Sequence, residues 1–247
     1  MVYRTPNGKA LVITNEDYPD FNAVFAIKCE SRRESRSLIE DLAKRIAFSG
    51  KRPSVWLDDF CRPTDLPEIL TKLGFRQVST FSILAAKPLE IKPKIRANMT
   101  IWQVTDGWRE LRAWINIYGL AFGQVDLSYD LIRWKQAFNK QLEENPPLQF
   151  YLGFKPLEEQ VEFFPGIPVT VGQMIVSHGT GGIYSIGTIP EQRGRGFASE
   201  MISNLAIMAR LAGLEFTYLT TQNSENSRFF ERLGFTEAVR TEIWRPK

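Results

Sequence analysis

The residues best suited to chemistry lie in one basic, glycine-rich stretch, residues 186–198, which reads IGTIPEQRGRGFA. Gly194 and Gly196 have no Cβ, so the backbone there can approach a ligand closely and its N–H groups can converge on anionic oxygens. A helical pattern follows, and a helix N-terminus attracts negative charge. Arg193 and Arg195 add positive charge, although one of them can simply point into water. The spacing therefore predicts a binding site for a pyrophosphate group.

The same stretch carries a family signature. Residues 193–198, RGRGFA, match the pattern R/Q-x-x-G-x-G/A, and on this motif the chain resembles the GNAT superfamily of acyl-CoA N-acyltransferases. The resemblance extends before and after the motif, because the predicted elements follow the family's order. These elements are a hairpin at 168–177 and 182–188, a helix at 199–211, a strand at 216–221, a helix and turn ending in Leu233, Gly234 and Phe235, and a closing strand at 239–244.

The resemblance implies an N-acetyltransferase that moves an acetyl group from acetyl-CoA to a primary amine of a small molecule or peptide, by direct attack in a ternary complex. It also assigns the residues that hold acetyl-CoA. Asn223 either contacts the CoA arm, as the corresponding asparagine does in some members, or caps the following helix. By register, the pantetheine arm is bound by the backbone of Ile186, Gly187 and Thr188, and the pyrophosphate by Arg193, Gly194, Arg195, Gly196, Phe197 and Ala198.

The groups that move protons depart from the family's pattern. Many members have a glutamate on the strand before the motif and a tyrosine in the last helix, whereas this chain has Gly182 and Phe230 at those positions. The remaining candidate catalytic residues are His178, Tyr184 and Ser185. His178 has the right intrinsic pKa for a base but can equally be an exposed turn residue. Tyr184 and Ser185 point to opposite faces of the predicted strand, so one can reach the acceptor while either can serve packing.

Two other functions remain open. The substitutions at the two proton-transfer positions favour a catalytically weak or inactive acyl-CoA-binding or regulatory protein. An interaction protein is also conceivable, with Arg32, Arg33 and Arg36 as its working surface. Solvated charge at the start of a helix explains that cluster more simply. The intact glycine motif favours the enzyme.

Composition is compatible with this prediction. The chain has 247 residues, 43% of them hydrophobic, which is enough for one large core or two modest ones. A net charge of +3 requires no nucleic-acid partner. We expect no membrane span and no signal peptide, and therefore a cytoplasmic location. A monomer or homodimer is expected. Cys29 and Cys61 lack metal-ligand spacing and are expected to be unbridged, and the single histidine excludes a multi-histidine site, so no metal is expected.

A repeat is visible between the two halves. Residues 55–85 parallel 216–244 in the order strand, polar turn, short helix, LGF, strand. In the first half, the turn that corresponds to the glycine-rich stretch is residues 29–37, CESRRESRS. It has no glycine, so close approach of a pyrophosphate is doubtful there. We expect a tandem α/β (α+β) fold with mixed, mostly antiparallel sheets flanked by helices. Its parts are a degenerate N-terminal domain at 1–90, a linker at 91–98 and a GNAT-like acetyl-CoA-binding domain at 99–247.

Periodicity places the other elements. Strands are expected at 25–28, 99–104 and 148–154, and helices at 35–49, 108–122 and 129–143. Trp108 and Trp114 are expected in the core, although an aromatic stripe can also floor an acceptor pocket. Residues 154–168 are expected to form a loop, in which Glu158, Glu159 and Glu162 are solvated or attract a cationic amine.

Overall fold

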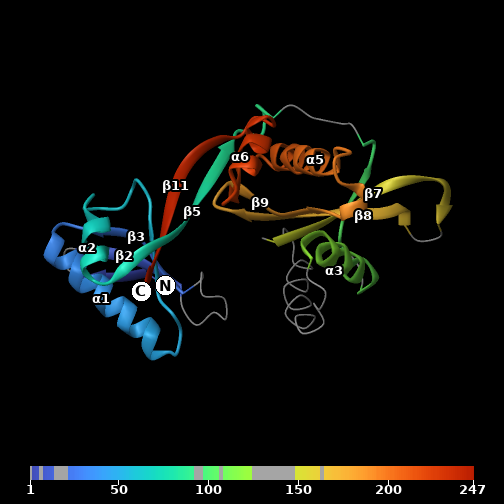
Figure 1. The fold of residues 1–247 in the computed structure, drawn as a ribbon. Helices are drawn as coiled ribbons and strands as arrows, with labels where there is room; N and C mark the ends of the chain where they lie inside the picture. Colours follow the sequence, from blue (N-terminus) through green and yellow to red (C-terminus); the bar gives the residue numbers. More distant parts are fainter. Residues whose placement is uncertain are drawn as a thin grey trace. The chain divides into compact units, whose positions relative to one another are not determined.

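The structure of the protein is a computed structural model that describes residues 2–5, 8–13, 22–91, 97–105, 108–123, 148–161 and 164–247. The chain folds into two compact units, each built on a sheet with packed helices (Figure 1). The first unit contains Met1–Ile83, Thr220–Ser227 and Glu237–Lys247, and the second contains Leu84–Leu219 and Arg228–Thr236.

The first unit begins with three antiparallel strands. Its elements are β1 (Val2–Thr5), β2 (Gly8–Ile13), β3 (Ala23–Cys29), α1 (Arg32–Phe48), β4 (Ser54–Leu57), α2 (Leu66–Lys72), β5 (Phe75–Ala86) and part of β11 (Thr236–Pro246). The hydrogen-bonded order is β1-β2-β3-β4-β11-β5, in which β3 and β4 are parallel. The β1–β2 hairpin is an addition to the predicted elements.

Helix α1 packs on the sheet of the first unit, beside β2 and β3 (Figure 1). It begins after Ser31, whose side chain accepts a hydrogen bond from the Glu34 N–H and so caps the helix. Leu38, Leu42 and Ile46 recur at helical spacing and are buried in the core of this unit. The helix predicted at 35–49 is therefore confirmed, with its start three residues earlier.

The second unit contains the glycine-rich stretch. Its elements are the end of β5, β6 (Thr100–Gln103), α3 (Trp108–Phe122), β7 (Leu148–Val161), β8 (Phe164–Ser177), β9 (Thr180–Thr188), η4 (Pro190–Gln192), α5 (Phe197–Leu211), β10 (Phe216–Thr221) and parts of α6 (Ser224–Glu231) and β11. The strand order is β5-β10-β9-β8-β7-β6. The predicted helix at 108–122 and strand at 216–221 coincide with α3 and β10.

Two helices cover opposite faces of this second sheet, with α5 on one side of β8 and β9 and α3 on the other (Figure 1). Alternation along β7 explains the two layers. Phe150, Leu152 and Phe154 lie in the core beside α3, whereas Tyr151 lies in the core beside α5. Strand β9 runs between these layers, and the glycine-rich stretch follows at its end.

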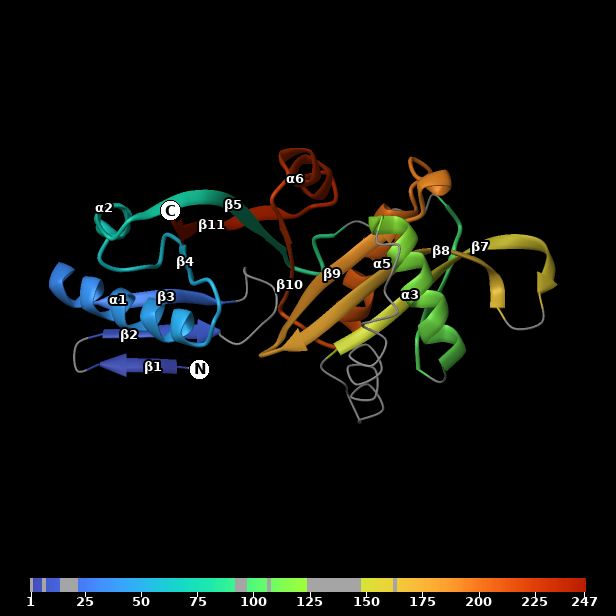
Figure 2. The ribbon, with the colours of Figure 1, turned by 60° about the horizontal axis from the view of Figure 1, so that its bottom comes forward.

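The prediction of a loop at 154–168 is wrong in part. Strands β7 and β8 continue as an antiparallel ladder through Phe154↔Pro168, Lys155↔Ile167 and Pro156↔Gly166 and extend beyond α3 (Figure 2). Charged and proline residues suggested a loop, but pairing with β8 outweighs local propensity. The side chains of Glu158, Glu159 and Glu162, and the helix predicted at 129–143, lie outside what the structure describes.

The two tryptophans of α3 have different environments. Trp114 is buried, and its indole N–H donates to the Gly172 carbonyl at 3.2 Å. Trp108, the first residue of the helix, is 43% exposed, and the Arg112 guanidinium lies 5.6 Å from its ring centroid. The expectation that both belong to the core is therefore wrong for Trp108, because a side chain at the first position of a helix points back past the helix start and has no preceding turn to pack on.

The boundaries of the two units differ from the boundaries expected from the repeat. Residues Thr220–Ser227 and Glu237–Lys247 belong to the first unit, although they come last in the sequence. The reason is strand pairing, since β11 pairs antiparallel with β4 through Glu242↔Leu57 and Trp244↔Val55. Trp244 is consequently part of the first unit's core. Among the described residues, no helix is long and apolar enough to cross a bilayer.

Candidate functional site

Strand β9 separates from β10 partway along its length. The parallel ladder between them consists of three residue pairs, from Phe216↔Thr180 to Tyr218↔Gly182. On its other side β9 remains paired with β8 as far as Thr188. The part of β9 after Gly182 therefore presents a strand edge toward the side where β10 has diverged, and such an edge can hydrogen-bond an extended ligand.

The residues after β9 form a tight turn that leads into α5. We call residues 193–196 the glycine turn. Gly194 has φ +76° and Gly196 has φ +93°, a backbone conformation that residues with a Cβ rarely adopt. Gly196 is also the residue before α5, and it has no side chain with which to cap the helix. The first N–H groups of α5 are thus suited to an anion, as the sequence predicts.

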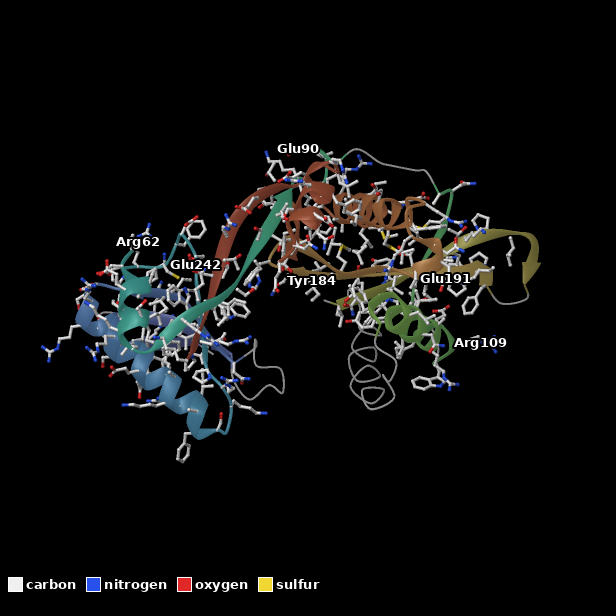
Figure 3. All side chains as sticks on the ribbon, viewed as in Figure 1. Arg62, Glu90, Arg109, Tyr184, Glu191 and Glu242 are labelled. Carbon is white, nitrogen blue, oxygen red and sulfur yellow. The ribbon has the colours of Figure 1, made fainter. Side chains whose placement is uncertain are left out.

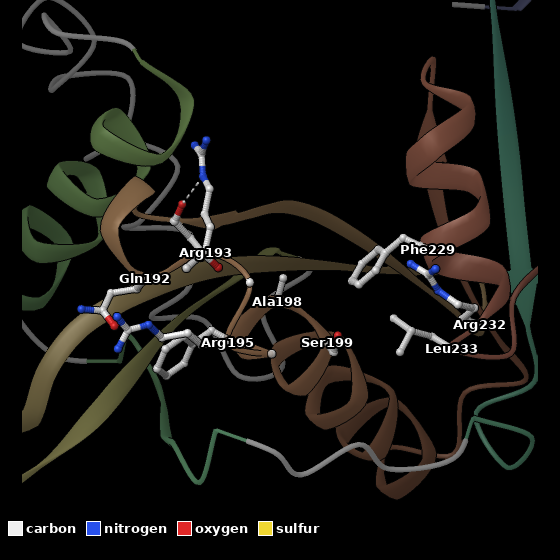
Figure 4. A pocket seen from close by; sticks show the side chains of 12 residues that line it. Gln192, Arg193, Arg195, Ala198, Ser199, Phe229, Arg232 and Leu233 are labelled. Carbon is white, nitrogen blue, oxygen red and sulfur yellow. Dashed lines mark hydrogen bonds between the residues drawn. The ribbon is translucent and has the colours of Figure 1, made fainter.

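A cavity of about 650 Å³ opens beside the glycine turn. One wall is the turn itself and the start of α5, and the opposite wall comes from the end of α6 and the residues after it (Figure 4). Arg195 and Arg232 supply positive charge, and Phe229 an apolar surface. The lining residues are Thr188, Gln192, Arg193, Gly194, Arg195, Gly196, Phe197, Ala198, Ser199, Phe229, Arg232 and Leu233.

Sequence reasoning missed the wall formed by Phe229 and Arg232. Both precede the Leu233–Phe235 turn, which the resemblance had assigned only a structural place. An arginine next to a recognised turn was the available signal, but its distance of almost forty positions from Arg195 hid the connection. Folding brings the two arginines to one cavity, where they can together neutralise the negative charge of a diphosphate.

Arg193 is placed differently from Arg195. Its Nε donates to the Thr188 carbonyl at 3.2 Å, and its Nη2 donates to the Ala121 carbonyl at 2.7 Å. Figure 4 shows the first of these bonds, with the guanidinium groups of Arg193 and Arg195 pointing in different directions. Both motif arginines are exposed and line the cavity, and Arg193 is also hydrogen-bonded to two backbone carbonyls.

A tyrosine pair occupies the point where β9 and β10 separate. The Tyr184 hydroxyl donates to the Tyr218 hydroxyl at 3.3 Å, and the rings meet edge to face at 6.1 Å between centroids. A Cβ on Gly182 would lie 2.6 Å from the Tyr184 ring and 2.8 Å from the Tyr218 hydroxyl. The side chains of these tyrosines thus take the space that a side chain at position 182 would need.

Burial, and then the hydrogen bond with Tyr218, raise the pKa of Tyr184 above its ordinary value. The phenol is consequently protonated at neutral pH, so it can donate a hydrogen bond or a proton but cannot serve as a strong base. Tyr184 lies on β9 (Figure 3). It is the candidate catalytic residue that best fits the diverging part of the strand.

Ser185 sits in an irregularity of β9. It has φ +53°, and the ladder with β8 shifts register between Val171 and Gln173, as in a β-bulge. Its hydroxyl donates to the Oε1 atom of Gln173 at 2.6 Å. The side chain is thus committed to a partner on β8.

His178 lies in the turn between β8 and β9, at the end of β9 opposite the glycine turn. It is exposed, and its Nδ1 atom is 2.6 Å from the Ser177 hydroxyl. Nine residues of strand separate it from the glycine turn, which amounts to roughly 30 Å of extended chain. This placement favours the turn role over the catalytic one.

Asn223 and Phe230 have structural roles at α6. The Asn223 side-chain oxygen accepts a hydrogen bond from the Glu225 N–H at 2.7 Å, which caps the helix. Phe230 packs against the core beside α5. Of the two roles that the sequence leaves open for Asn223, the structure describes the cap.

The carbonyl groups at the end of β9 already have protein partners. The Gly187 carbonyl accepts from the buried Thr170 hydroxyl at 2.8 Å, and the Thr188 carbonyl accepts from Arg193. Ile186 packs its side chain against the core beside α5. A ligand arm along β9 would therefore meet other backbone groups, or the second lone pairs of these carbonyls.

The first unit repeats the element order β3, α1, β4, α2, β5, but its corresponding space is filled by its own chain. β3 and β4 pair at Ala23↔Ser54 and Val24↔Val55. Farther along β3, the backbone of Arg62 pairs with the strand where β4 no longer does. The Arg62 N–H donates to the Ile27 carbonyl at 2.9 Å, and the Arg62 carbonyl accepts from the Cys29 N–H at 3.0 Å. The edge of β3 at this point is thus satisfied from within the unit.

The start of α1 is also occupied. Arg32 pairs with Asp65 at 2.8 Å and with Glu68 at 2.5 Å, and Arg36 pairs with Glu40 at 3.1 Å. These carboxylates and the Ser31 cap make the start of α1 unsuitable for an anion. The arginine cluster that suggested an interaction surface is in part a set of ion pairs within this unit.

Comparison with known proteins adds independent information. Residues 168–245 match the family model described as FR47-like protein. No curated protein matches the chain. Among solved structures, the chain is similar to a GCN5-related N-acetyltransferase from Kribbella flavida, with a TM-score of 0.72 and 18% identity over 100% of this chain and 89% of that chain.

Two further structures have the same architecture. A GCN5-related N-acetyltransferase from Sphaerobacter thermophilus gives a TM-score of 0.71 at 17% identity, over 97% of this chain and 76% of that one. A tandem GNAT protein from the clavulanic acid biosynthesis pathway gives 0.64 at 10% identity, over 98% and 80%. The expected fold class, a mixed and mostly antiparallel sheet flanked by helices, is confirmed: this chain has the fold of the GNAT superfamily.

Proposed function

We propose that the second unit binds acetyl-CoA and transfers its acetyl group to a primary amine of a small molecule or peptide. The observation that carries this proposal is the glycine turn, which opens an uncapped helix start onto a cavity containing Arg195 and Arg232. A diphosphate fits such a site, because backbone N–H groups, the helix dipole and two guanidinium groups all favour negative charge. The pantetheine arm would follow the diverging edge of β9, with Ile186, Gly187 and Thr188 nearest the turn.

In the proposed reaction the amine nitrogen attacks the thioester carbonyl carbon, the C–S bond breaks, and CoA leaves as a thiolate that takes up a proton. Tyr184 supports the later part of this sequence, because its protonated phenol can exchange its hydrogen bond to Tyr218 for one to the developing oxyanion or to the leaving sulfur. Positioning of the two substrates along β9 would supply much of the remaining rate enhancement. The acceptor enters as the neutral amine or loses its proton to water.

The test is calorimetric titration with acetyl-CoA, using Gly196→Asp as the disabling variant. This change places a carboxylate where the pyrophosphate is expected and strains a residue with φ +93°, so affinity should fall tenfold or more, on the order of a lost charge-assisted bond. Gly213→Asp is the matched control, since Gly213 follows the other end of α5 with φ +71° and lies outside the cavity lining.

Saturable binding that survives in Gly213→Asp and is lost in folded Gly196→Asp supports the assignment. Equal affinity in the two variants would refute it. The second candidate is an acyl-CoA-binding protein without turnover. It predicts binding but no release of free CoA thiol when a panel of amines is added.

We include in this proposal a degenerate first unit. Its element order repeats that of the second unit, and its ligand position is taken by its own chain. The unit would complete its own sheet with β11.

A further inference from the structure

Arg193 joins two parts of the second unit that the sequence separates by more than sixty residues. Its backbone belongs to the glycine turn and lines the cavity, while its guanidinium group reaches the C-terminal end of α3. The bond to the Ala121 carbonyl, at 2.7 Å, has the length of a strong charge-assisted hydrogen bond. A second bond to the Thr188 carbonyl holds the same side chain against the end of β9.

The end of α3 is in close contact with β9 at this place. A Cβ on Gly187 would lie 2.8 Å from the Ala121 Cβ and 2.7 Å from the Phe122 ring, so only glycine allows the helix to approach this far. The last turn of α3 contains no basic residue of its own. Arg193 therefore provides the positive charge that favours a helix C-terminus.

We propose that Arg193 is a positioning residue, which couples occupation of the glycine turn to the placement of α3. When a pyrophosphate fixes the backbone of the turn, the guanidinium group of Arg193 holds Ala121, and the end of α3 becomes more rigid. The proposal rests on the proposed function, because it takes acyl-CoA as the ligand of the turn. By linkage, a second ligand whose affinity for α3 rises when acyl-CoA is bound would raise the affinity for acyl-CoA by the same factor. The coupling would order the end of α3 only once the acyl donor is present.

The alternative is that Arg193 releases its two carbonyl partners and binds the pyrophosphate directly. Arg195 offers a matched comparison, since it is the same residue type two positions away and already lies at the cavity. A direct ligand and a positioning residue differ in one respect. Replacing an arginine that binds the pyrophosphate directly weakens acyl-CoA binding. Replacing a positioning arginine leaves acyl-CoA binding intact and removes the effect of acyl-CoA on α3.

The experiment measures CoA affinity by calorimetry and amide hydrogen exchange of residues 108–122 with and without saturating CoA. Wild type should show slower exchange in α3 when CoA is bound. Arg195→Ala should bind CoA about tenfold more weakly, yet show the same slowing once saturated. Arg193→Ala should bind CoA within about threefold of wild type and show no CoA-dependent slowing in α3. Arg193→Lys, which keeps the charge and one donor, should recover part of the slowing.

Two results would overturn the coupling. One is CoA-dependent slowing of exchange in Arg193→Ala that equals the wild-type effect. The other is a loss of CoA affinity in Arg193→Ala as large as that in Arg195→Ala, which would make Arg193 a direct ligand. If Arg193→Ala does not fold, the comparison uses Arg193→Lys, for which CoA-dependent slowing equal to the wild-type effect would overturn the coupling. Failure of wild type to bind CoA is a separate result, which removes the proposed function and this coupling together.

Discussion

At the scale of single residues, the tyrosine pair on β9 and β10 most clearly distinguishes this chain from the pattern of the superfamily whose fold it has. Position 182 has no space for a side chain because Tyr184 and Tyr218 fill it. The tyrosine pair therefore accounts for the glycine at the position where many superfamily members have a glutamate. Restoring a glutamate at position 182 alone would collide with both rings. The polar group available on this strand is therefore a phenol that donates.

Tyr184 leads to a prediction about pH. Its pKa is raised above the ordinary tyrosine value of 10.0, so its contribution to stability is complete below pH 10 and is lost as pH rises toward the raised value. Urea unfolding at pH 8 and pH 10.5 should show a larger loss of free energy in wild type than in Tyr184→Phe, which cannot ionise. An equal loss in both proteins would contradict the buried, protonated phenol.

At the scale of elements, α5 is held in place by a carboxylate as well as by its apolar face. Glu200, in the first turn of α5, is 2% exposed, and its two oxygens accept hydrogen bonds from the Ala97 N–H at 2.7 Å and the Met99 N–H at 2.9 Å. These bonds fasten the chain before β6 to the helix that begins at the glycine turn. The sequence pattern of α5 does not reveal this role, since a glutamate in the first turn of a helix is usually solvated.

Glu200→Gln should therefore destabilise the protein. A glutamine has only one side-chain oxygen, so one buried N–H would lose its acceptor, and the free energy of unfolding should fall by about 1–3 kcal/mol. Chemical denaturation gives this quantity directly. Glu215→Gln, at an exposed loop position, is the control that should change stability by less than about 0.5 kcal/mol. Equal effects of the two substitutions would show that the buried bonds contribute nothing specific.

At the scale of the whole molecule, the two units share part of their element order, and in the described residues their candidate ligand positions differ. Arg62 bonds the edge of β3 in the first unit, and Asp65 and Glu68 pair with Arg32 at the start of α1. The second unit offers a diverging strand edge and an uncapped helix start instead. We expect calorimetry to give one acetyl-CoA per chain and expect Gly196→Asp to remove all binding. A second site that survives this substitution would place a ligand in the first unit.

The sequence by itself determined the local features. The glycine turn, the helix after it and most strand positions follow from residue type and spacing, because backbone freedom, helix starts and periodicity are properties of neighbouring residues. The positive φ values of Gly194 and Gly196 agree with what the motif predicted.

Tertiary structure alone decided where distant segments meet. It brought Arg232 to the same cavity as Arg195, turned Arg193 toward α3, filled the space at Gly182 with two tyrosine side chains, and paired the last strand, β11, with β4 of the first unit. Residue type and spacing alone do not predict these contacts, because each depends on the packing of side chains far apart in the sequence. Strand pairing and side-chain packing are long-range interactions, so they appear only when the whole chain has folded.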